Sequence, residues 1–250
     1  MNEHVLAWNG LFLLVTALLM AAPLYPAWKE WLKPQDGAAL ALEPLQQSPV
    51  PLIVRRFHLT ASTPKAVSMA ASESITVMPG SRFEKLMAPI IRFGIHDTTE
   101  PQEDTFAPGK RCMALHSLPD ATPWGDGGWR VHGDCRIPAS HHLKGSLVVT
   151  GQLSVEHGCL IEGDIKAHGD IHLSPDVVVK GALVGQKNIE LEQACRVHGP
   201  VVCGEQLSLG AAVILGLPNQ TTSVCAQDIT AHPTARAHGA VWARHSGQVV

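Results

Sequence analysis

The side chains that could do chemistry in this sequence are first of all six cysteines and fourteen histidines. None of the cysteines forms a Cys-x-x-Cys pair, so the spacing typical of zinc ribbons and thioredoxin-like sites is missing. Cys112 and His116 have a spacing that two ligands of one metal ion can have, but no second pair completes four ligands. We therefore expect neither a metal nor another cofactor. The cysteines are Cys112, Cys135, Cys159, Cys195, Cys203 and Cys225.

The histidines do not assemble a catalytic group in the sequence. Those at turns or outward positions of the repeat described below have no carboxylate, nucleophile or cleft implied by their spacing. They are His157, His168, His172 and His198. The sequence also lacks a nucleophile elbow, a P-loop and a dinucleotide fingerprint. We interpret the histidines as solvated surface and predict that the protein is not an enzyme.

The composition favours thin, regularly stacked β-structure. The 250 residues are 45% hydrophobic and 16% charged, which is enough apolar material for a core. Glycine occurs 22 times, tyrosine once and phenylalanine five times, a bias away from a bulky aromatic core. The net charge of −3, without a basic run, gives no electrostatic signature of nucleic acid binding.

A repeat of 18 residues dominates the carboxyl-terminal half of the chain. Two series of glycines recur at this interval. The first is Gly145, Gly163, Gly181 and Gly199, and the second is Gly133, Gly151 and Gly169. Each unit divides into three sixes with two alternating apolar positions. Of the 24 such positions from Leu147 to Leu215, all but Gly185 are apolar, whereas the 45% background of the chain predicts about eleven.

This alternation predicts an all-β fold, a parallel β-helix of about six three-strand turns, because a strand that turns after every six residues coils into a prism. Equivalent residues then stack about 4.8 Å apart. The expected interior columns are Cys159, Val177, Cys195 and Val213, and Leu153, Ile171, Ile189 and Leu207. The thiols of Cys159, Cys195 and Cys203 should therefore be buried rather than reactive. The repeat glycines are expected at corners whose backbone angles a Cβ would oppose, and residues 217–223 are expected to form a protruding loop.

Two groups of apolar residues fall on outward positions of the repeat. Val148, Val184 and Val202 share one face, and Leu160, Val178 and Ile214 share another. Either residues 83–93 cover one of these faces, or the faces contact another protein or a second filament, and the sequence leaves both alternatives open. In addition, the open strand edges of the first and last turns invite stacking of further copies. The expected partner is therefore the chain itself, as a homopolymer or homo-oligomer.

The beginning of the chain contains a candidate membrane anchor. Apart from aromatic edges, Asn9 and Thr16 are the only polar side chains of residues 5–25, which as a helix would span about 30 Å of hydrocarbon. A cleaved signal peptide is the alternative, but no Lys or Arg precedes the segment. Lys29 and Lys33 follow it, which predicts that the rest of the chain lies in the cytoplasm. The unpaired thiols agree with that reducing compartment.

We thus expect three parts in the chain. Residues 1–33 form a single transmembrane helix with its flank, residues 34–125 a largely irregular linker, and residues 126–250 the β-helix. Proline breaks and Ser/Thr clusters characterise the middle part. Two of its segments, residues 51–59 and 81–93, have strand-like or apolar patterns and are expected to pack against the next domain.

Several runs within the repeat carry a resemblance to a known family. They are Trp-Arg-Val-His-Gly-Asp-Cys-Arg-Ile from Trp129, Gly-Ser-Leu-Val-Val from Gly145, Ile-Glu-Gly-Asp-Ile-Lys-Ala-His-Gly-Asp-Ile from Ile161, and Val-His-Gly-Pro-Val from Val197. These runs resemble the bactofilin family of polymer-forming bacterial cytoskeletal proteins, over about half of the chain. The resemblance implies a right-handed β-helix that polymerises end to end without nucleotide. It also implies a place at the bacterial inner membrane, where the protein scaffolds envelope-synthesis or cell-shape partners.

Two alternatives belong to other classes of protein. A hexapeptide-type acyltransferase also repeats in sixes, but its pattern puts a small residue directly after the aliphatic one, whereas here Lys166 follows Ile165 and His172 follows Ile171. A periplasmic carbohydrate-binding or adhesin β-helix would require the opposite membrane orientation.

Overall fold

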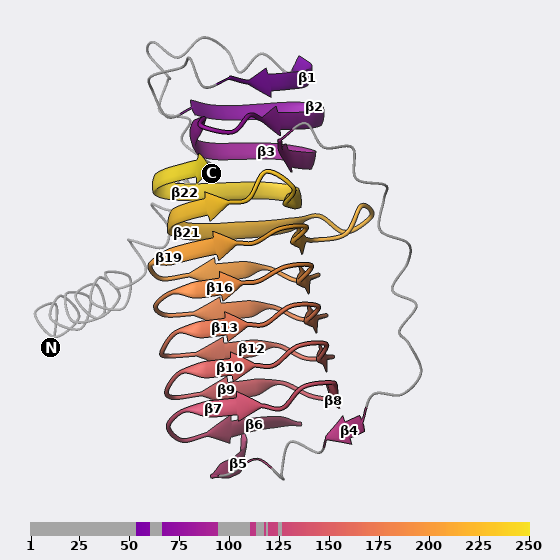
Figure 1. Cartoon of the computed structure of the whole chain (residues 1–250), viewed down its shortest axis with the longest axis vertical. Helices are drawn as coiled ribbons and strands as arrows, with labels where there is room; N and C mark the ends of the chain where they lie inside the picture. The colour runs from indigo at the N-terminus through magenta and orange to yellow at the C-terminus, as the bar shows by residue number, and fades with distance from the viewer. Residues whose placement is uncertain (1–53, 61–66, 95–110, 114–117, 119, 125–126) are drawn as a thin grey trace, which may run out of the picture. The chain divides into compact units, whose positions relative to one another are not determined.

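The computed structural model describes residues 54–60, 67–94, 111–113, 118, 120–124 and 127–250. Their regular structure consists of β-strands, which coil into a parallel β-solenoid of about nine turns (Figure 1). The predicted all-β fold and parallel β-helix are confirmed. The predicted transmembrane helix lies outside the described residues, and within them no helix is long and apolar enough to cross a membrane.

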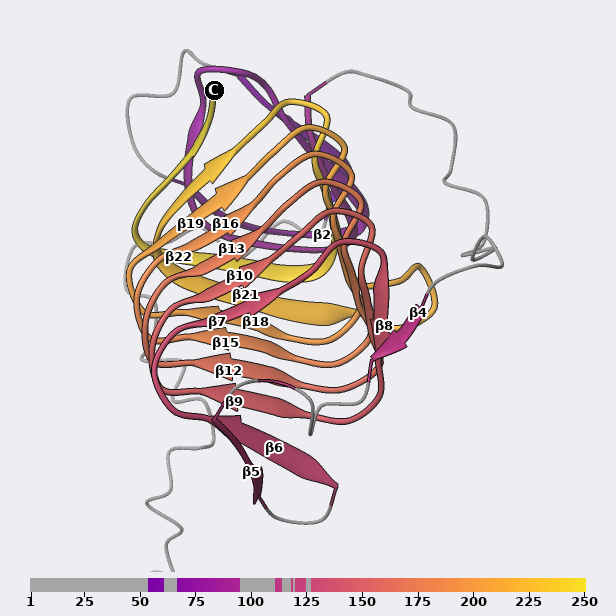
Figure 2. The same ribbon diagram turned by 60° about the horizontal axis from the view of Figure 1, so that its bottom comes forward.

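The solenoid has three faces, on each of which equivalent strands stack turn upon turn (Figures 1 and 2). The first face contains β7 (Cys135–Ile137), β10 (Leu153–Val155), β13 (Ile171–Leu173), β16 (Ile189–Leu191) and β19 (Gln206–Leu209). The second contains β8 (His141–Leu143), β11 (Leu160–Ile161), β14 (Val178–Val179), β17 (Arg196–Val197) and β20 (Ile214–Leu215). The third contains β6 (Gly128–Val131), β9 (Leu147–Val149), β12 (Ile165–Ala167), β15 (Leu183–Gly185) and β18 (Val201–Cys203). The longer strands β21 (Thr222–Ala231) and β22 (Arg236–Val249) pass round corners and pair on more than one face.

The strands pair with the offset that the glycine spacing predicts. Leu153, Ile171, Ile189 and Leu207 are successive partners, 18 residues apart, and each is at most 1% exposed. The second predicted column is equally buried, because residues at alternate positions of a strand point to the same side and here all point inward.

One extra loop changes this offset. Val201 pairs with Val224 and Leu207 with Ile229, so the separation grows from 18 to 23 and 22 residues. The added residues form a loop at 216–221, within which Leu217 and Gln220 make an isolated bridge. The loop is shorter than the predicted 217–223, because β21 already begins at Thr222.

In five successive turns, one corner holds a residue in the left-handed backbone conformation. The φ angle lies between 56° and 66° at Ser140, Gly158, Asp176, Ala194 and Ala212, which again follow one another at 18 residues. A Cβ makes this conformation unfavourable, and only one of the five residues is a glycine.

Most of the predicted corner glycines are needed for a different reason. Gly133 and Gly145 have positive φ, but the later members of both series do not. There the stacked backbones come very close, so that a Cβ on Gly199 would lie 2.5 Å from the carbonyl oxygen of Gly181. Close approach of successive turns, rather than the backbone angle, therefore excludes side chains from these corners.

The chain folds back so that its amino-terminal strands extend the solenoid beyond β22 (Figure 1). These strands are β1 (Val54–Leu59), β2 (Val67–Val77) and β3 (Arg82–Phe93), together called the amino-terminal turns. β3 pairs with β22 in antiparallel orientation, and β2 and β1 follow in parallel. These strands fall in the predicted linker, of which residues 51–59 and 81–93 were expected to pack against the next domain. They form additional turns, so the solenoid has about nine turns where the repeat alone predicts about six.

The antiparallel junction has a geometric reason. The amino-terminal turns advance along the axis toward β22, whereas the carboxyl-terminal turns advance toward β3. Two coils of the same hand that approach each other run in opposite directions where they meet. The apolar interior is continuous across the junction, because Leu86 faces Val241 and Ile91 faces Ala237, all at most 1% exposed.

At the opposite end, two short strands flank the first turn (Figure 2). β5 (Ala121–Trp124) pairs with β6 in antiparallel orientation, and β4 (Arg111–Met113) pairs with β8 in parallel orientation. Between them, β7 has β10 as its only paired strand in the described part of the chain.

Candidate assembly surfaces

The first predicted group of outward apolar residues is partly brought together. Val184 and Val202 are neighbours on the third face, and the column continues through Cys225 to Trp242. Val202 is 45% and Trp242 is 48% exposed. We call these four residues the apolar stripe. Val148 does not join it, because Lys166 separates it from Val184 and its side chain is buried.

Trp242 was not recognised from the sequence, since the extra loop before β21 shifts it out of the 18-residue spacing. Two cations lie against its ring. Lys85 Nζ is 5.5 Å and the Arg244 guanidinium 6.0 Å from the ring centroid. Lys85 belongs to β3, so this cation–π contact also joins the amino-terminal turns to β22.

The second predicted group is also divided. Leu160 and Val178 are neighbours, whereas Arg196 separates Val178 from Ile214. Leu160 and Val178 are buried, and Ile214 is half-buried. Residues 83–93 pair with β22 at the junction.

Within the residues that the structure describes, the open edge of the first turn is formed by β7. The Cys135 N–H donates to the Gln152 carbonyl (2.8 Å), and the Ile137 carbonyl accepts from the Glu156 N–H (2.9 Å). Because backbone groups of successive residues point to opposite sides of a strand, the N–H and C=O of Arg136 point away from β10. They are the groups that an added strand would pair with.

Among the described strands, the outer edge at the other end of the stack is β1. This strand has only six residues, of which Arg55 and Arg56 are exposed. Arg56 forms an ion pair with Glu73 of β2 (2.9 Å). Short length and charged side chains are the usual means by which an edge strand is kept from pairing with other chains.

The interior thiols are buried, as predicted. Cys159 and Cys195 are fully buried, and the Cys195 thiol donates to the carbonyl of Ser174 (3.1 Å). The Cys203 thiol donates to the carbonyl of Lys187 (3.0 Å). Burial raises the pKa of Cys135 and Cys195 to about 11, so these thiols stay protonated at neutral pH and are poor nucleophiles.

The histidine environment differs from the prediction in one respect. His172 has two carboxylates beside it, Glu190 at Nδ1 and Glu192 at Nε2, each at 3.2 Å. The sequence did not indicate them because they are brought close only by the stacking of β13 on β16. Both ring nitrogens therefore lie against carboxylates of the next turn.

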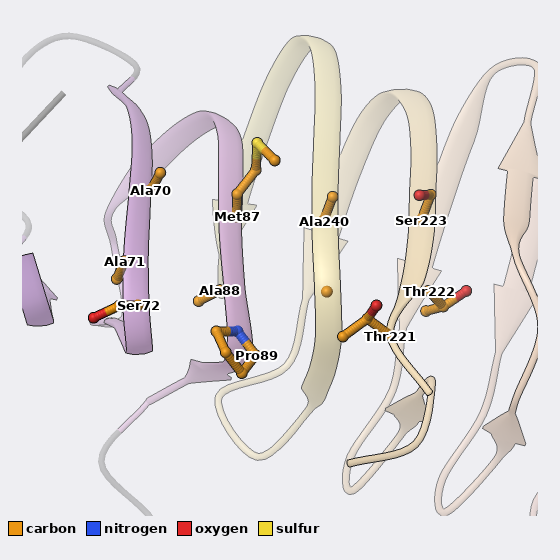
Figure 3. Close-up of a pocket in the computed structure, with 11 residues that line it drawn as sticks. Ala70, Ala71, Ser72, Met87, Ala88, Pro89, Thr221, Thr222, Ser223 and Ala240 are labelled. Carbon is orange, nitrogen blue, oxygen red and sulfur yellow. The ribbon is translucent and has the colours of Figure 1, made fainter. Parts of the chain in front are cut away.

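A shallow depression of about 480 Å³ crosses the junction between the amino-terminal turns and the rest of the solenoid (Figure 3). Ala70, Met87, Ala240 and Ser223 lie in one row across it, as successive strand partners. None of its eleven lining residues has a titratable side chain. Among the described residues, no group of three or more His, Cys, Asp or Glu is placed to hold a metal ion.

Comparison of the chain with family models, curated proteins and solved structures finds no match. The fold itself defines the class of protein, a parallel β-solenoid. Its chemically distinctive features are strand edges, an exposed apolar stripe and an intramolecular junction between two coils.

Proposed function

We propose that this chain is a non-enzymatic structural scaffold that associates with copies of itself through the strand edges of its solenoid. Residues 5–25 tether it to the bacterial inner membrane with the solenoid in the cytoplasm, where it organises envelope-synthesis or cell-shape proteins. The membrane tether and the envelope partners agree with what the resemblance to bactofilins implies, whereas a closed dimer of the full chain differs from the end-to-end polymer that the resemblance implies. The observation that carries the proposal is the open edge of β7 at the first turn.

Edge pairing supports self-association because unpaired N–H and C=O groups of a strand gain partners from a second strand. The junction between β3 and β22 supplies an intramolecular precedent, since two coils meet there edge to edge with a continuous apolar interior. Two first turns would meet in the same antiparallel way. Such a contact uses the same surface of both copies and closes as a twofold dimer.

The test uses the full chain in a mild detergent without nucleotide, and two variants at one position. Arg136→Pro removes the outward N–H of β7, and proline is tolerated in an edge strand. Arg136→Ala keeps that N–H but also loses the ion pair with Glu156 (2.8 Å), so it is the matched control. Sedimentation equilibrium should give about twice the 26.8 kDa chain mass for the wild type and Arg136→Ala, and the single-chain mass for Arg136→Pro.

Two results would count against the proposal. Either the wild type remains a single chain at every concentration, or Arg136→Pro associates as strongly as Arg136→Ala. Far-UV circular dichroism of both variants checks that the β content is retained.

A further inference from the structure

The longest edge of the solenoid is covered by a distant part of the same chain. β22 has 14 residues, and β3 pairs along most of its length. Beyond the strands, the Phe93 N–H donates to the Ala235 carbonyl (3.2 Å), and the Gly80 N–H donates to the Val249 carbonyl (2.8 Å). The pairing therefore extends over the whole of the last turn.

The contact is also matched in shape. Phe83 is fully buried and pairs with Gly247, where a Cβ would collide with the phenyl ring. Phe93 packs against Phe83 with ring centroids 5.7 Å apart. Glycine at 247 thus gives Phe83 space to enter the interior. A covering strand of arbitrary sequence would not fill this space.

The amino-terminal turns replace a long edge by a short one. Without them, the outer edge would be the 14-residue β22, whose backbone groups would be open to any added strand. With them, it is the six-residue β1, which carries Arg55 and Arg56. The exchange lowers the capacity of this end of the stack for edge pairing.

Chain connectivity makes this cover releasable. β3 is followed in the sequence by β4, which pairs with β8 at the opposite end of the stack, and of the strands from β6 to β22 only β22 pairs with the amino-terminal turns. Separation of β3 from β22 would therefore leave the strand pairing from β6 to β22 intact.

We propose that the amino-terminal turns are an intramolecular cap that prevents β22 from pairing with a second copy of this chain. The inference rests on the proposed self-association. A capped chain has one open end, at β7, and forms closed dimers. A chain whose cap is released has two open ends and forms open, growing assemblies.

Substitutions within β3 test the cap in the full chain. Leu86→Asp combined with Ile91→Asp places two carboxylates against Val241 and Ala237, where their burial without a partner opposes docking. Met87→Asp is the matched control, because Met87 lies on the same strand but is 45% exposed. The double variant should sediment with a mass that grows with concentration beyond the wild-type value, and Met87→Asp should not. Trypsin cleavage at Arg82 and Lys85 reports whether β3 has been released.

A disulfide lock tests the same claim without destabilising the fold. Met87 and Ala240 are antiparallel partners, with Cβ atoms expected about 4.5–5.5 Å apart, close enough for cysteines to cross-link after a small adjustment. Met87→Cys with Ala240→Cys, in a background with Cys112→Ser and Cys225→Ser, should form an intramolecular disulfide, so that both introduced thiols are lost while the chain still migrates as a single chain on a non-reducing gel. Met87→Cys with the exposed Lys166→Cys, on β12, should not cross-link.

Two outcomes would overturn the cap. In the first, trypsin shows β3 released while the sedimentation of the double variant equals that of Met87→Asp. In the second, the cysteine pair links different chains into a ladder, which would make β3 an assembly contact. Both readouts compare variants with each other, so they remain informative if the wild type fails to dimerise through β7.

Discussion

At the scale of single residues, the left-handed corners hold two alanines in a backbone conformation that their Cβ atoms make unfavourable. Ala194 and Ala212 have φ angles of 58° and 56°, a conformation that costs an alanine about 1–2 kcal/mol. Ala194→Gly removes this cost, while the greater freedom of glycine in the unfolded chain offsets about 0.4–1 kcal/mol of the gain. We expect a net increase of about 0.5–1 kcal/mol in the free energy of unfolding, measured by urea denaturation.

The neighbouring alanine provides the control for this prediction. Ala211 is not among the residues with positive φ, so Ala211→Gly should lower the free energy of unfolding by about 0.5–1 kcal/mol. If both substitutions destabilise equally, the corner is not strained.

The buried thiols predict a loss of stability at alkaline pH. Burial raises the pKa of Cys195 from 9.0 to about 11, so the folded chain holds this proton more tightly than the unfolded chain does. This difference in proton affinity affects the free energy of unfolding: its stabilising contribution is complete below about pH 9 and is lost as the pH rises toward 11. Cys195→Val removes the titration and suits the column, in which both neighbours, Val177 and Val213, are valines.

Between pH 8 and pH 10, the free energy of unfolding should therefore fall by about 1 kcal/mol less in Cys195→Val than in the wild type. Urea denaturation at the two pH values measures the difference. Equal slopes in the two proteins would mean that the thiol ionises in the folded chain as readily as in the unfolded one.

At the scale of elements, the two kinds of corner should respond differently to the same substitution. Gly199→Ala forces a Cβ to within 2.5 Å of the Gly181 carbonyl oxygen, so the stacked turns must separate, at a cost of about 1–3 kcal/mol. At Gly158 a Cβ would have only the Ser140 hydroxyl nearby, at 3.7 Å, and alanine is already accepted at the equivalent Ala194. Gly158→Ala should cost about 1 kcal/mol. Thermal denaturation of the pair would contradict this account if Gly158→Ala were the more damaging.

The apolar stripe belongs to the same scale, because strand stacking creates it. We predict that it provides a lateral contact between the growing assemblies that form once the cap is released. In the Leu86→Asp, Ile91→Asp background, Val202→Lys places a charge in its centre and should reduce lateral association about tenfold or more, while β content is retained. Gln186→Lys adds the same charge at an exposed corner outside the stripe and is the control. Equal association of both variants, measured by light scattering of the assembled protein, would remove the stripe from the contact surface.

At the scale of the whole molecule, the 18-residue period was sufficient to predict the solenoid, because it determines both the turn length and the inward columns. Leu153 and Ile171 illustrate this, since their pairing follows directly from their separation. The packing of β3 on β22 could not be read in this way. It joins parts of the chain about 150 residues apart, across an antiparallel junction that no repeat spacing encodes.

The candidate surfaces were only partly predictable for the same reason. Val184 and Val202 were recognised because they obey the period, and Trp242 was missed because a loop interrupts it. The Ser- and Thr-rich Val67–Val77 was assigned to a linker, although it becomes a regular strand once Val77 and Ile75 enter the interior beside β3. Its polar residues interrupt the apolar alternation in the sequence, so the strand is recognised only from its packing beside β3.

The central claim is that the chain associates with itself through strand edges and that the amino-terminal turns close one end. Sedimentation velocity of the full-length chain over a concentration series tests this most directly. The full chain is required because a fragment lacking residues 54–94 exposes the β22 edge that the intact protein covers. We predict a single species of about two chains that stops growing as concentration rises. A single chain at all concentrations would contradict self-association, and growth of the wild type without limit would contradict the closed end.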